Sequence, residues 1–204
     1  MNYLFFDIEC ANCFEGVGKI CEFGYVLTDE NLTVLENGIF LINPNAKFDW
    51  YVRCKIISYK IREYLASSTY PKVYHAHIKR LLEREDTLCV GHGIKNDVGF
   101  LYDECARYAL PRLNLRYVDT SLVRKKFYNE RQEKSLKKIV KELEIGDPKS
   151  LHNSEYDAKM TLEYVKILCR ESGLSFAELI DRYSNNKMKR KMCGDNRGKG
   201  AKSD

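Results

Sequence analysis

The sequence is poor in the residues that mark fibrous, disordered or membrane-spanning chains. Its 204 residues include only 12 glycines and 4 prolines, and 44% are hydrophobic, which excludes a collagen-like or wholly disordered chain. The longest apolar run in the first half, residues 39–42, is far shorter than the roughly 20 residues of a membrane-spanning helix. No basic segment opens the chain, and Asp7 comes before an apolar signal core can form. We therefore expect one globular domain, intracellular and cytoplasmic, with no membrane partner.

Eight cysteines are present, which in a secreted chain would indicate disulfides. In the reducing compartment expected here they are interpreted as thiols. The Cys10-x-x-Cys13 pair has the spacing of a zinc knuckle, but a tetrahedral site needs two more ligands. The sequence has no second Cys-x-x-Cys and no Cys-x-x-His, so it favours thiol side chains over a zinc site.

Positive charge is concentrated at the C-terminus. The net charge is +5, and residues 185–204 hold seven basic residues against two acidic ones, which accounts for the whole excess. We expect a folded domain over residues 1–184 and a disordered basic tail over residues 185–204. Two interpretations of the tail stay open. Either it grips phosphates, with Lys187 and Arg190 as candidate contacts, or it only keeps the chain soluble.

The hydrophobic pattern predicts an α/β fold. Strand-like stretches come first, a segment of loops and short helices follows over residues 44–70, and helices then alternate with strands. Asn37-Gly38, inside the third stretch, is compatible with either a bulge or a turn. The predicted strands cover residues 3–8, 19–28, 32–42, 87–91 and 115–118, and the predicted helices cover residues 71–84, 96–109, 136–145 and 155–170, with a last helix opening at Ser175.

Two carboxylates lie at the end of the first predicted strand. Asp7 and Glu9 are two residues apart, so both side chains point to the same face of the sheet. The apolar residues before them place the pair at the sheet edge where α/β folds build their sites. Paired carboxylates repel each other unless a proton or cation neutralises them, and hard oxygen ligands favour Mg²⁺ or Mn²⁺. The spacing alone is also common on solvated surfaces.

Two further acids and a histidine complete a candidate site. Asp97 follows the strand at residues 87–91 and shares its helix side with apolar residues, although a helix N-cap is an alternative role. Asp157 repeats this arrangement, and His152 precedes it in the connecting loop. Histidine is suited to taking a proton from water near neutral pH. Because an α/β sheet gathers such positions at one edge, we expect all five residues to meet.

Three segments resemble the motifs of one enzyme family. They are LFFDIE over residues 4–9, VGHGIKNDVGFL over residues 90–101 and HNSEYDA over residues 152–158. Together they resemble the three exonuclease motifs of the DEDDh exonucleases, which include proofreading subunits of bacterial replicative polymerases, ribonuclease T and oligoribonuclease. The chain departs from the usual pattern at Gly93, where the family has Asn, and at Asn96, where it has Phe.

The resemblance implies a ribonuclease H-like fold, with a mixed five-stranded sheet, one antiparallel strand and helices on both faces. It implies a 3′→5′ exonuclease with two Mg²⁺ or Mn²⁺ ions. Asp7 would touch both ions, Glu9 and Asp157 one of them, and Asp97 the other. By the same resemblance His152 would deprotonate the attacking water and release 5′-nucleoside monophosphates.

Partners and competing functions follow from the same resemblance. The expected substrate is the 3′ end of a nucleic acid, single-stranded in the main expectation, and a homodimer or a polymerase partner is compatible with the family. One alternative is an inactive nucleic-acid-binding or polymerase-associated module, and another is a phosphohydrolase of small molecules. Phe14, Phe100 and Trp50 would either stack on bases or lie in the core. The candidate substrate contacts are Cys10, Phe14, His92, Phe100, Lys187 and Arg190.

Overall fold

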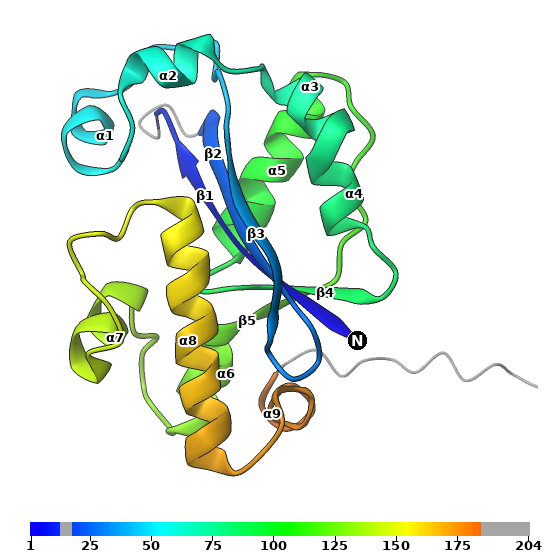
Figure 1. The fold of residues 1–204 in the computed structure, drawn as a ribbon, viewed down its shortest axis with the longest axis vertical. Helices are drawn as coiled ribbons and strands as arrows, with labels where there is room; N and C mark the ends of the chain where they lie inside the picture. The colour runs from blue at the N-terminus through cyan, green and yellow to red at the C-terminus, as the bar shows by residue number, and fades with distance from the viewer. Residues whose placement is uncertain (13–17, 185–204) are drawn as a thin grey trace, which may run out of the picture.

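A computed structural model describes residues 1–12 and 18–184 of the chain. These residues form a mixed five-stranded sheet with the order β3-β2-β1-β4-β5 (Figure 1). β2 is antiparallel to both of its neighbours, β1 and β3, whereas β1, β4 and β5 are parallel to one another. In this sheet β2 therefore runs against the direction of the other four strands. The fold class predicted from the sequence is confirmed. The strands are β1 (Asn2–Cys10), β2 (Ile20–Thr28), β3 (Val34–Leu41), β4 (Thr87–Gly91) and β5 (Tyr117–Asp119).

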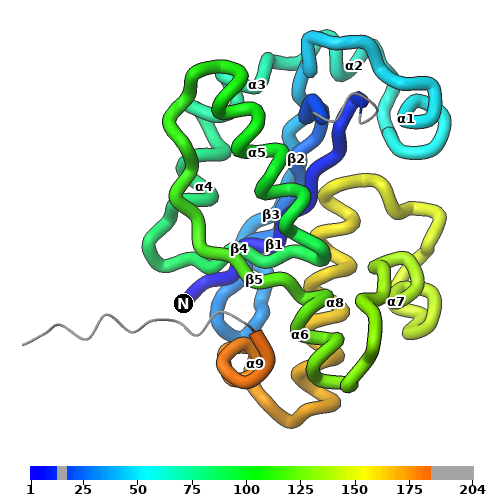
Figure 2. The backbone as a smooth tube through the Cα atoms, turned by 180° about the vertical axis from the view of Figure 1, so that it is seen from behind, coloured from blue at the N-terminus to red at the C-terminus, as the bar shows by residue number. Residues whose placement is uncertain are grey.

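Helices cover both faces of the sheet, as Figures 1 and 2 show from opposite sides. One face packs on α3, a π-helical turn, α4 and α5, and the other packs on α6 to α9. The short helices α1 and α2 lie beside the end of β1. The helices are α1 (Trp50–Lys55), α2 (Ile61–Ala66), α3 (Tyr70–Val73), the π-helical turn (Tyr74–Ile78), α4 (Lys79–Leu82), α5 (Lys95–Arg107), α6 (Thr120–Phe127), α7 (Leu136–Leu143), α8 (Ser154–Ser172) and α9 (Phe176–Tyr183).

Side chains along β1 point alternately to the two faces of the sheet. Leu4 and Phe6 belong to the core on the α5 side, whereas Tyr3 and Phe5 belong to the core on the α8 side. Continuing the same alternation, Asp7 and Glu9 follow Phe5 on the α8 side of the sheet. The apolar part of β1 therefore fixes the direction of the two acids that end it.

A close approach between β2 and α8 positions the start of that helix. A Cβ atom on Gly24 would lie 2.0 Å from the backbone nitrogen of Glu155, so only glycine fits at this point of the strand. The Asn153 side chain caps the helix by accepting a hydrogen bond from the Tyr156 backbone N–H. The first turn of α8, which carries Asp157, is therefore held in place by its close contact with Gly24 and by the Asn153 cap.

The structure corrects two predictions. Asn37 and Gly38 form neither a bulge nor a turn, because both pair with β2 inside β3, and the register shift lies between Leu27 and Thr28. The sequence analysis also missed α6, which begins where the Asp119 carboxylate accepts a hydrogen bond from the Ser121 backbone N–H. No helix in the described part of the chain is both long and apolar enough to cross a membrane.

Candidate metal and nucleotide site

The four predicted acids come together at the ends of β1, α5 and α8. Asp7 and Glu9 lie in β1, and Asp97 and Asp157 lie in the first turns of α5 and α8, where both are buried. Asp7 interacts electrostatically with each of the other three carboxylates, and Glu9 with Asp97 and Asp157. Three elements that are distant in the sequence thus supply one acidic cluster.

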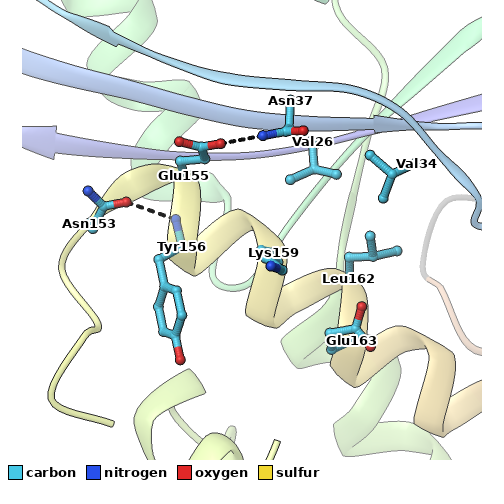
Figure 3. Close-up of a pocket in the computed structure, with 9 residues that line it drawn as sticks. All are labelled: Val26, Val34, Asn37, Asn153, Glu155, Tyr156, Lys159, Leu162 and Glu163. Atoms are coloured by element: carbon cyan, nitrogen blue, oxygen red, sulfur yellow. Dashed lines mark hydrogen bonds between the residues drawn. The ribbon is translucent and has the colours of Figure 1, made fainter. Parts of the chain in front are cut away.

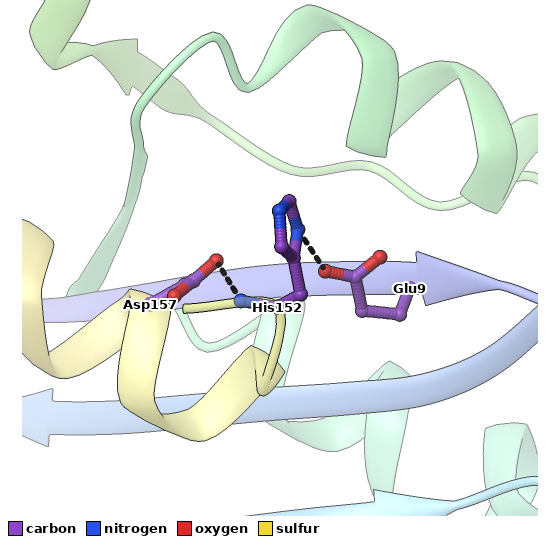
Figure 4. A group of neighbouring side chains, drawn as sticks. All are labelled: Glu9, His152 and Asp157. Carbon is purple, nitrogen blue, oxygen red and sulfur yellow. Dashed lines mark hydrogen bonds and ion pairs between the residues drawn. The ribbon is translucent and has the colours of Figure 1, made fainter. Parts of the chain in front are cut away.

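His152 lies against this cluster, as Figure 4 shows. Its Nδ1 is 3.6 Å from Glu9 Oε1, and its backbone N–H donates a 3.2 Å hydrogen bond to Asp157 Oδ2. The backbone of His152 has a φ of +73°, a left-handed conformation that is uncommon for residues other than glycine. Strained backbone of this kind concentrates at functional sites, where neighbouring contacts maintain it.

The cluster strongly favours bound protons or cations. Burial, followed by repulsion from Asp97, Asp157 and Glu9, raises the pKa of Asp7 well above its ordinary value. Burial raises the pKa of Asp97 to about 8 and that of Asp157 to about 7, although backbone hydrogen bonds partly oppose both shifts. The hydrogen bond with Glu9, against a smaller effect of burial, raises the pKa of His152.

The residues fit a divalent cation. Asp157 Oδ1 is shielded from solvent and has no hydrogen-bond partner within the described residues. An unpartnered buried carboxylate oxygen is costly unless a cation or proton satisfies it. Ligand atoms of Glu9, His152 and Asp157 all lie within 4.8 Å of one another, and the donors are mainly hard carboxylate oxygens.

A cleft of about 500 Å³ opens over the cluster. Asp7 and Glu9 of β1 line it together with His152 and Asp157 at the start of α8, and Glu133, Lys134 and Lys137 line it from the start of α7 and the residues before it. Its size lies within the range of sites for nucleotide-sized ligands. A cation held by these acids, with Lys137 nearby, would suit a phosphate-bearing ligand.

A second cavity, of about 340 Å³, lies between the sheet and the outer side of α8 (Figure 3). Val26, Val34 and Asn37 line it from β2 and the edge strand β3, and Asn37 donates a hydrogen bond to Glu155. The described residues that line it include none of the five predicted catalytic ones. Four of those five residues line the first cleft instead.

Comparison with known proteins identifies the family. The family model for exonucleases of the RNase_T type matches residues 4–165, most of the chain. The chain belongs to this exonuclease family. The predicted resemblance is therefore confirmed at the level of the family.

The fold of this exonuclease family member is similar to that of E. coli exonuclease I. A structure of that enzyme with a dA16 oligonucleotide is 17% identical, with a TM-score of 0.73 over 88% of this chain and 43% of that one. A zinc-ion-bound form with single-stranded DNA is 16% identical, with a TM-score of 0.73 over 89% of this chain and 42% of that one. This chain therefore spans less than half of either exonuclease I chain.

A sequence relative is a DNA polymerase III of PolC type from Ureaplasma parvum serovar 3. It is 26% identical over 168 residues, which cover 81% of this chain and 11% of the polymerase. The match is thus to a small part of a much longer protein.

The predicted substrate contacts divide into three groups. Cys10 is buried and Phe100 is partly buried against the same core, so both contact the protein interior. His92 lines the cleft, but its ring nitrogens lie 3.0 Å from Thr120 Oγ1 and 2.7 Å from the Lys134 carbonyl oxygen. Phe14, Lys187 and Arg190, like Cys13 of the cysteine pair and the tail over residues 185–204, lie outside the described residues.

The departure at Gly93 has a structural reason. Its backbone has a φ of +76°, and its N–H donates a hydrogen bond to the Asp119 carboxylate. Glycine adopts this conformation without steric cost. Gly93, directly after His92, therefore links the end of β4 to the cap of α6 through its backbone N–H and needs no side chain for this contact.

Glu22 is a site residue that the sequence analysis missed. This fully buried acid of β2 pairs in register with Glu9, accepts a hydrogen bond from the Tyr64 hydroxyl, and accepts two more from the backbone N–H and the hydroxyl of Ser154. Burial raises the pKa of Glu22, and these hydrogen bonds oppose the rise. The signal in the sequence is an acid inside an apolar strand, since acids are almost never fully buried unless they are paired.

Replacing Glu22 by alanine is expected to lower the free energy of unfolding by about 2 to 4 kcal/mol, because the change leaves buried donors of Tyr64 and Ser154 unsatisfied and opens a cavity. Urea denaturation measures this loss. The matched control is Glu36→Ala, which removes another acceptor of a tyrosine hydroxyl from an exposed position of β3. Equal losses in the two variants would contradict the structural role of Glu22.

Divalent cations are expected to stabilise the chain more at pH 8 than at pH 5. In the folded chain the pKa of Asp97 is about 8 and that of Asp157 is about 7, whereas in the unfolded chain both are near 4. At a pH between the unfolded and the folded pKa values, folding without metal therefore takes up protons. Their contribution to stability is therefore lost as pH rises through this range, and bound cations restore it. Thermal melting with and without Mn²⁺ measures the effect, expected to be several degrees larger at pH 8.

The control for this experiment is Asp97→Asn, which removes one carboxylate from the cluster. The variant is expected to melt at a higher temperature than the wild type at pH 8 without metal, and to gain less from Mn²⁺. Equal stabilisation of the wild type by Mn²⁺ at both pH values would contradict a cation site built from these acids.

Proposed function

We propose that this chain is a metal-dependent 3′→5′ exonuclease of the His-containing DEDDh subclass. It hydrolyses DNA, RNA or both from a 3′ end to 5′-nucleoside monophosphates. The observation that carries the proposal is the meeting of four acids from β1, α5 and α8 beside His152. Family membership supports hydrolysis of nucleic acid, and the exonuclease I structures with dA16 and single-stranded DNA support a single-stranded substrate.

Asp7, Glu9, Asp97 and Asp157 would hold two Mg²⁺ or Mn²⁺ ions. Following the family resemblance, we assign Asp7 to both ions, Glu9 and Asp157 to one, and Asp97 to the other, and the interaction of Asp7 with the three other acids is compatible with this assignment. When bound, the two ions stabilise negative charge on the attacking and leaving oxygens of the phosphodiester. The orphaned Asp157 Oδ1 supports this assignment from the protein side.

His152 would accept a proton from the attacking water. About 40% of its side chain is exposed, so the ring is accessible from the cleft. Glu9, on the Nδ1 side of the ring, stabilises the imidazolium that forms after proton transfer. The hydrogen bond from the His152 backbone to Asp157 holds the base beside the acids.

The wall of the cleft would receive the sugar-phosphate backbone. Lys137 offers positive charge toward phosphates that approach the acids, whereas Lys134 is paired with Glu130 and Glu142. Contacts of Lys137 with phosphates would be independent of base sequence. We propose that residues 1–184 form the exonuclease domain and that the basic tail adds non-specific phosphate contacts. A sequence-independent grip suits an enzyme that shortens any 3′ end.

The proposal is tested by incubating the full chain and Mg²⁺ with matched single-stranded and duplex DNA and RNA, labelled at the 5′ end. The expected result is a ladder of products that shorten from the 3′ end, with nucleoside 5′-monophosphates released. Internal cleavage, shortening from the 5′ end or an unchanged substrate would overturn it. Hydrolysis of a chromogenic phosphodiester without shortening of any oligonucleotide would favour a small-molecule phosphohydrolase.

An inactive polymerase-associated module is the second candidate, because the matched relative is a PolC-type polymerase. Such a module would bind nucleic acid or polymerase without hydrolysis, and Mn²⁺ would not raise its melting temperature. Hydrolysis together with metal stabilisation excludes it.

A further inference from the structure

The exposed face of α1 carries aromatic and basic side chains that the core does not use. Trp50 is 73% exposed and Tyr51 51% exposed, although large aromatic side chains are mostly buried in folded proteins. Val52 is the buried residue of the helix. Trp50 therefore lies opposite the buried side, flanked by Tyr51 and Arg53. We call Trp50, Tyr51, Arg53 and Lys55 the Trp50 patch.

Other rings of the same segment do pack inside. Phe48 and Tyr59 contact Tyr64 with ring centroids 5.3 and 6.2 Å apart, in a small cluster that also holds Ala11. This cluster anchors the segment, and neither Trp50 nor Tyr51 is among the described residues that form it or pack against it. Two large rings that are exposed next to each other form an apolar patch, and such a patch is a candidate binding surface.

The segment that carries the Trp50 patch is tied by two hydrogen bonds to residues next to the acidic cluster. The Asp49 backbone N–H, next to Trp50, donates a 3.0 Å hydrogen bond to the carbonyl of Ala11, two residues beyond Glu9. Ser58, just after α1, donates a 3.3 Å hydrogen bond to the carbonyl of His152. At about 3.3 Å per residue, Trp50 lies on the order of 15 Å from the acids along this route. Figures 1 and 2 both place α1 beside the end of β1.

The net charge of the segment around α1 indicates the kind of ligand that the patch would bind. Between residues 47 and 62 the chain has five basic residues and one acidic residue, so a polyanion is favoured over an acid-rich or neutral surface. Rings interleaved with cations are the usual platform for single strands, whose bases stack on aromatic faces while phosphates meet Lys and Arg.

From this juxtaposition we propose that the Trp50 patch binds the single-stranded nucleic acid a few nucleotides upstream of the 3′ end that lies in the cleft. Trp50 and Tyr51 stack on bases, and Arg53 and Lys55 contact phosphates. The inference rests on the proposed function, because it takes the strand end to be in the cleft. It adds a subsite that holds a long strand between cleavage steps and favours long substrates over dinucleotides.

Trp50 is the only tryptophan in the chain, so its fluorescence reports this subsite directly. The experiment uses the full chain with Asp7→Asn to prevent cleavage, titrated with a dinucleotide or with an oligothymidylate of about 12 nucleotides. We expect the longer strand to quench Trp50 and the dinucleotide to leave it unchanged. Tyr51→Ala keeps the reporter, and its quenching curve should shift to higher concentrations.

Anisotropy of a labelled strand measures the variants that lack the reporter. We expect Trp50→Ala to weaken binding of the long strand by roughly 5- to 100-fold, the loss of about one stacked base, and Trp50→Phe to restore most of it. Lys55→Ala should lower the slope of log affinity against log salt by about one. The control is Leu35→Ala, another exposed apolar residue, which lies in β3.

The outcomes separate this inference from the proposed function. Binding of Trp50→Ala within about twofold of the parent, or equal quenching by the dinucleotide, would overturn the subsite even if the wild type is an exonuclease. The wild type could also fail to hydrolyse any substrate while the long strand still quenches Trp50 and Trp50→Ala still binds it more weakly. That result would support the subsite and overturn the proposed exonuclease activity. Unchanged melting temperatures of the variants exclude misfolding as the cause.

Discussion

Replacing Asp7 by asparagine is expected to reduce the hydrolysis of a 3′-ended oligonucleotide by about a thousandfold or more. Burial, followed by repulsion from Asp97, Asp157 and Glu9, raises the pKa of Asp7, so its charge is the one that a bound cation would stabilise. Asparagine keeps the size of the side chain but removes the charge that a cation requires. Loss of several kcal/mol of transition-state stabilisation corresponds to a factor of this size.

Single-turnover cleavage of a 5′-labelled strand in Mg²⁺ measures this effect, and EDTA should abolish cleavage by the wild type. The matched control is Asp103→Asn, which removes an exposed acid from the same helix that carries Asp97 and should leave the rate unchanged. An Asp7→Asn variant that cleaves at the wild-type rate would remove the basis of the two-metal proposal.

Replacing His152 by alanine is expected to slow hydrolysis by about 10²- to 10⁴-fold, the usual contribution of general-base catalysis. A histidine acts as a general base in its neutral form, and the hydrogen bond with Glu9 raises the pKa of His152. The wild-type rate should therefore rise with pH as this group loses its proton. The variant should lack that rise in its pH–rate profile.

The stabilisation by Mn²⁺ distinguishes a base from a metal ligand. If His152 only transfers protons, His152→Ala should melt with nearly the full stabilisation by Mn²⁺ that the wild type shows. Loss of that stabilisation would instead identify the imidazole as a ligand, which its position within 4.8 Å of Glu9 and Asp157 oxygens also permits. The control is His75→Ala, an exposed histidine on the other side of the sheet.

The sequence was sufficient for features that depend on local periodicity. The apolar residues before Asp7 define β1, and strict alternation fixes the face on which Asp7 and Glu9 lie. The helix that carries Asp157 was likewise evident from apolar residues at helical spacing. Motif resemblance added the expectation that these elements meet, which no local pattern contains.

The sequence was insufficient where a role depends on a distant partner. Glu22 looks like an isolated acid in a strand until Tyr64 and Ser154, far along the chain, are brought to it. The helix α6 begins at Asp119, whose carboxylate serves both Ser121 and Gly93. The exposure of Trp50 depends on which other rings of its segment fill the small cluster around Tyr64. These three features depend on which distant side chains come into contact when the chain folds.

The order of elements along the chain also governs when the activity can first arise. All five strands precede α8, yet Asp157 and the neighbouring backbone contact to His152 belong to that late helix and its approach. Domains tend to acquire structure from the N-terminus as the ribosome delivers them. A nascent chain that ends before α8 holds Asp7, Glu9 and Asp97 but no complete cation site.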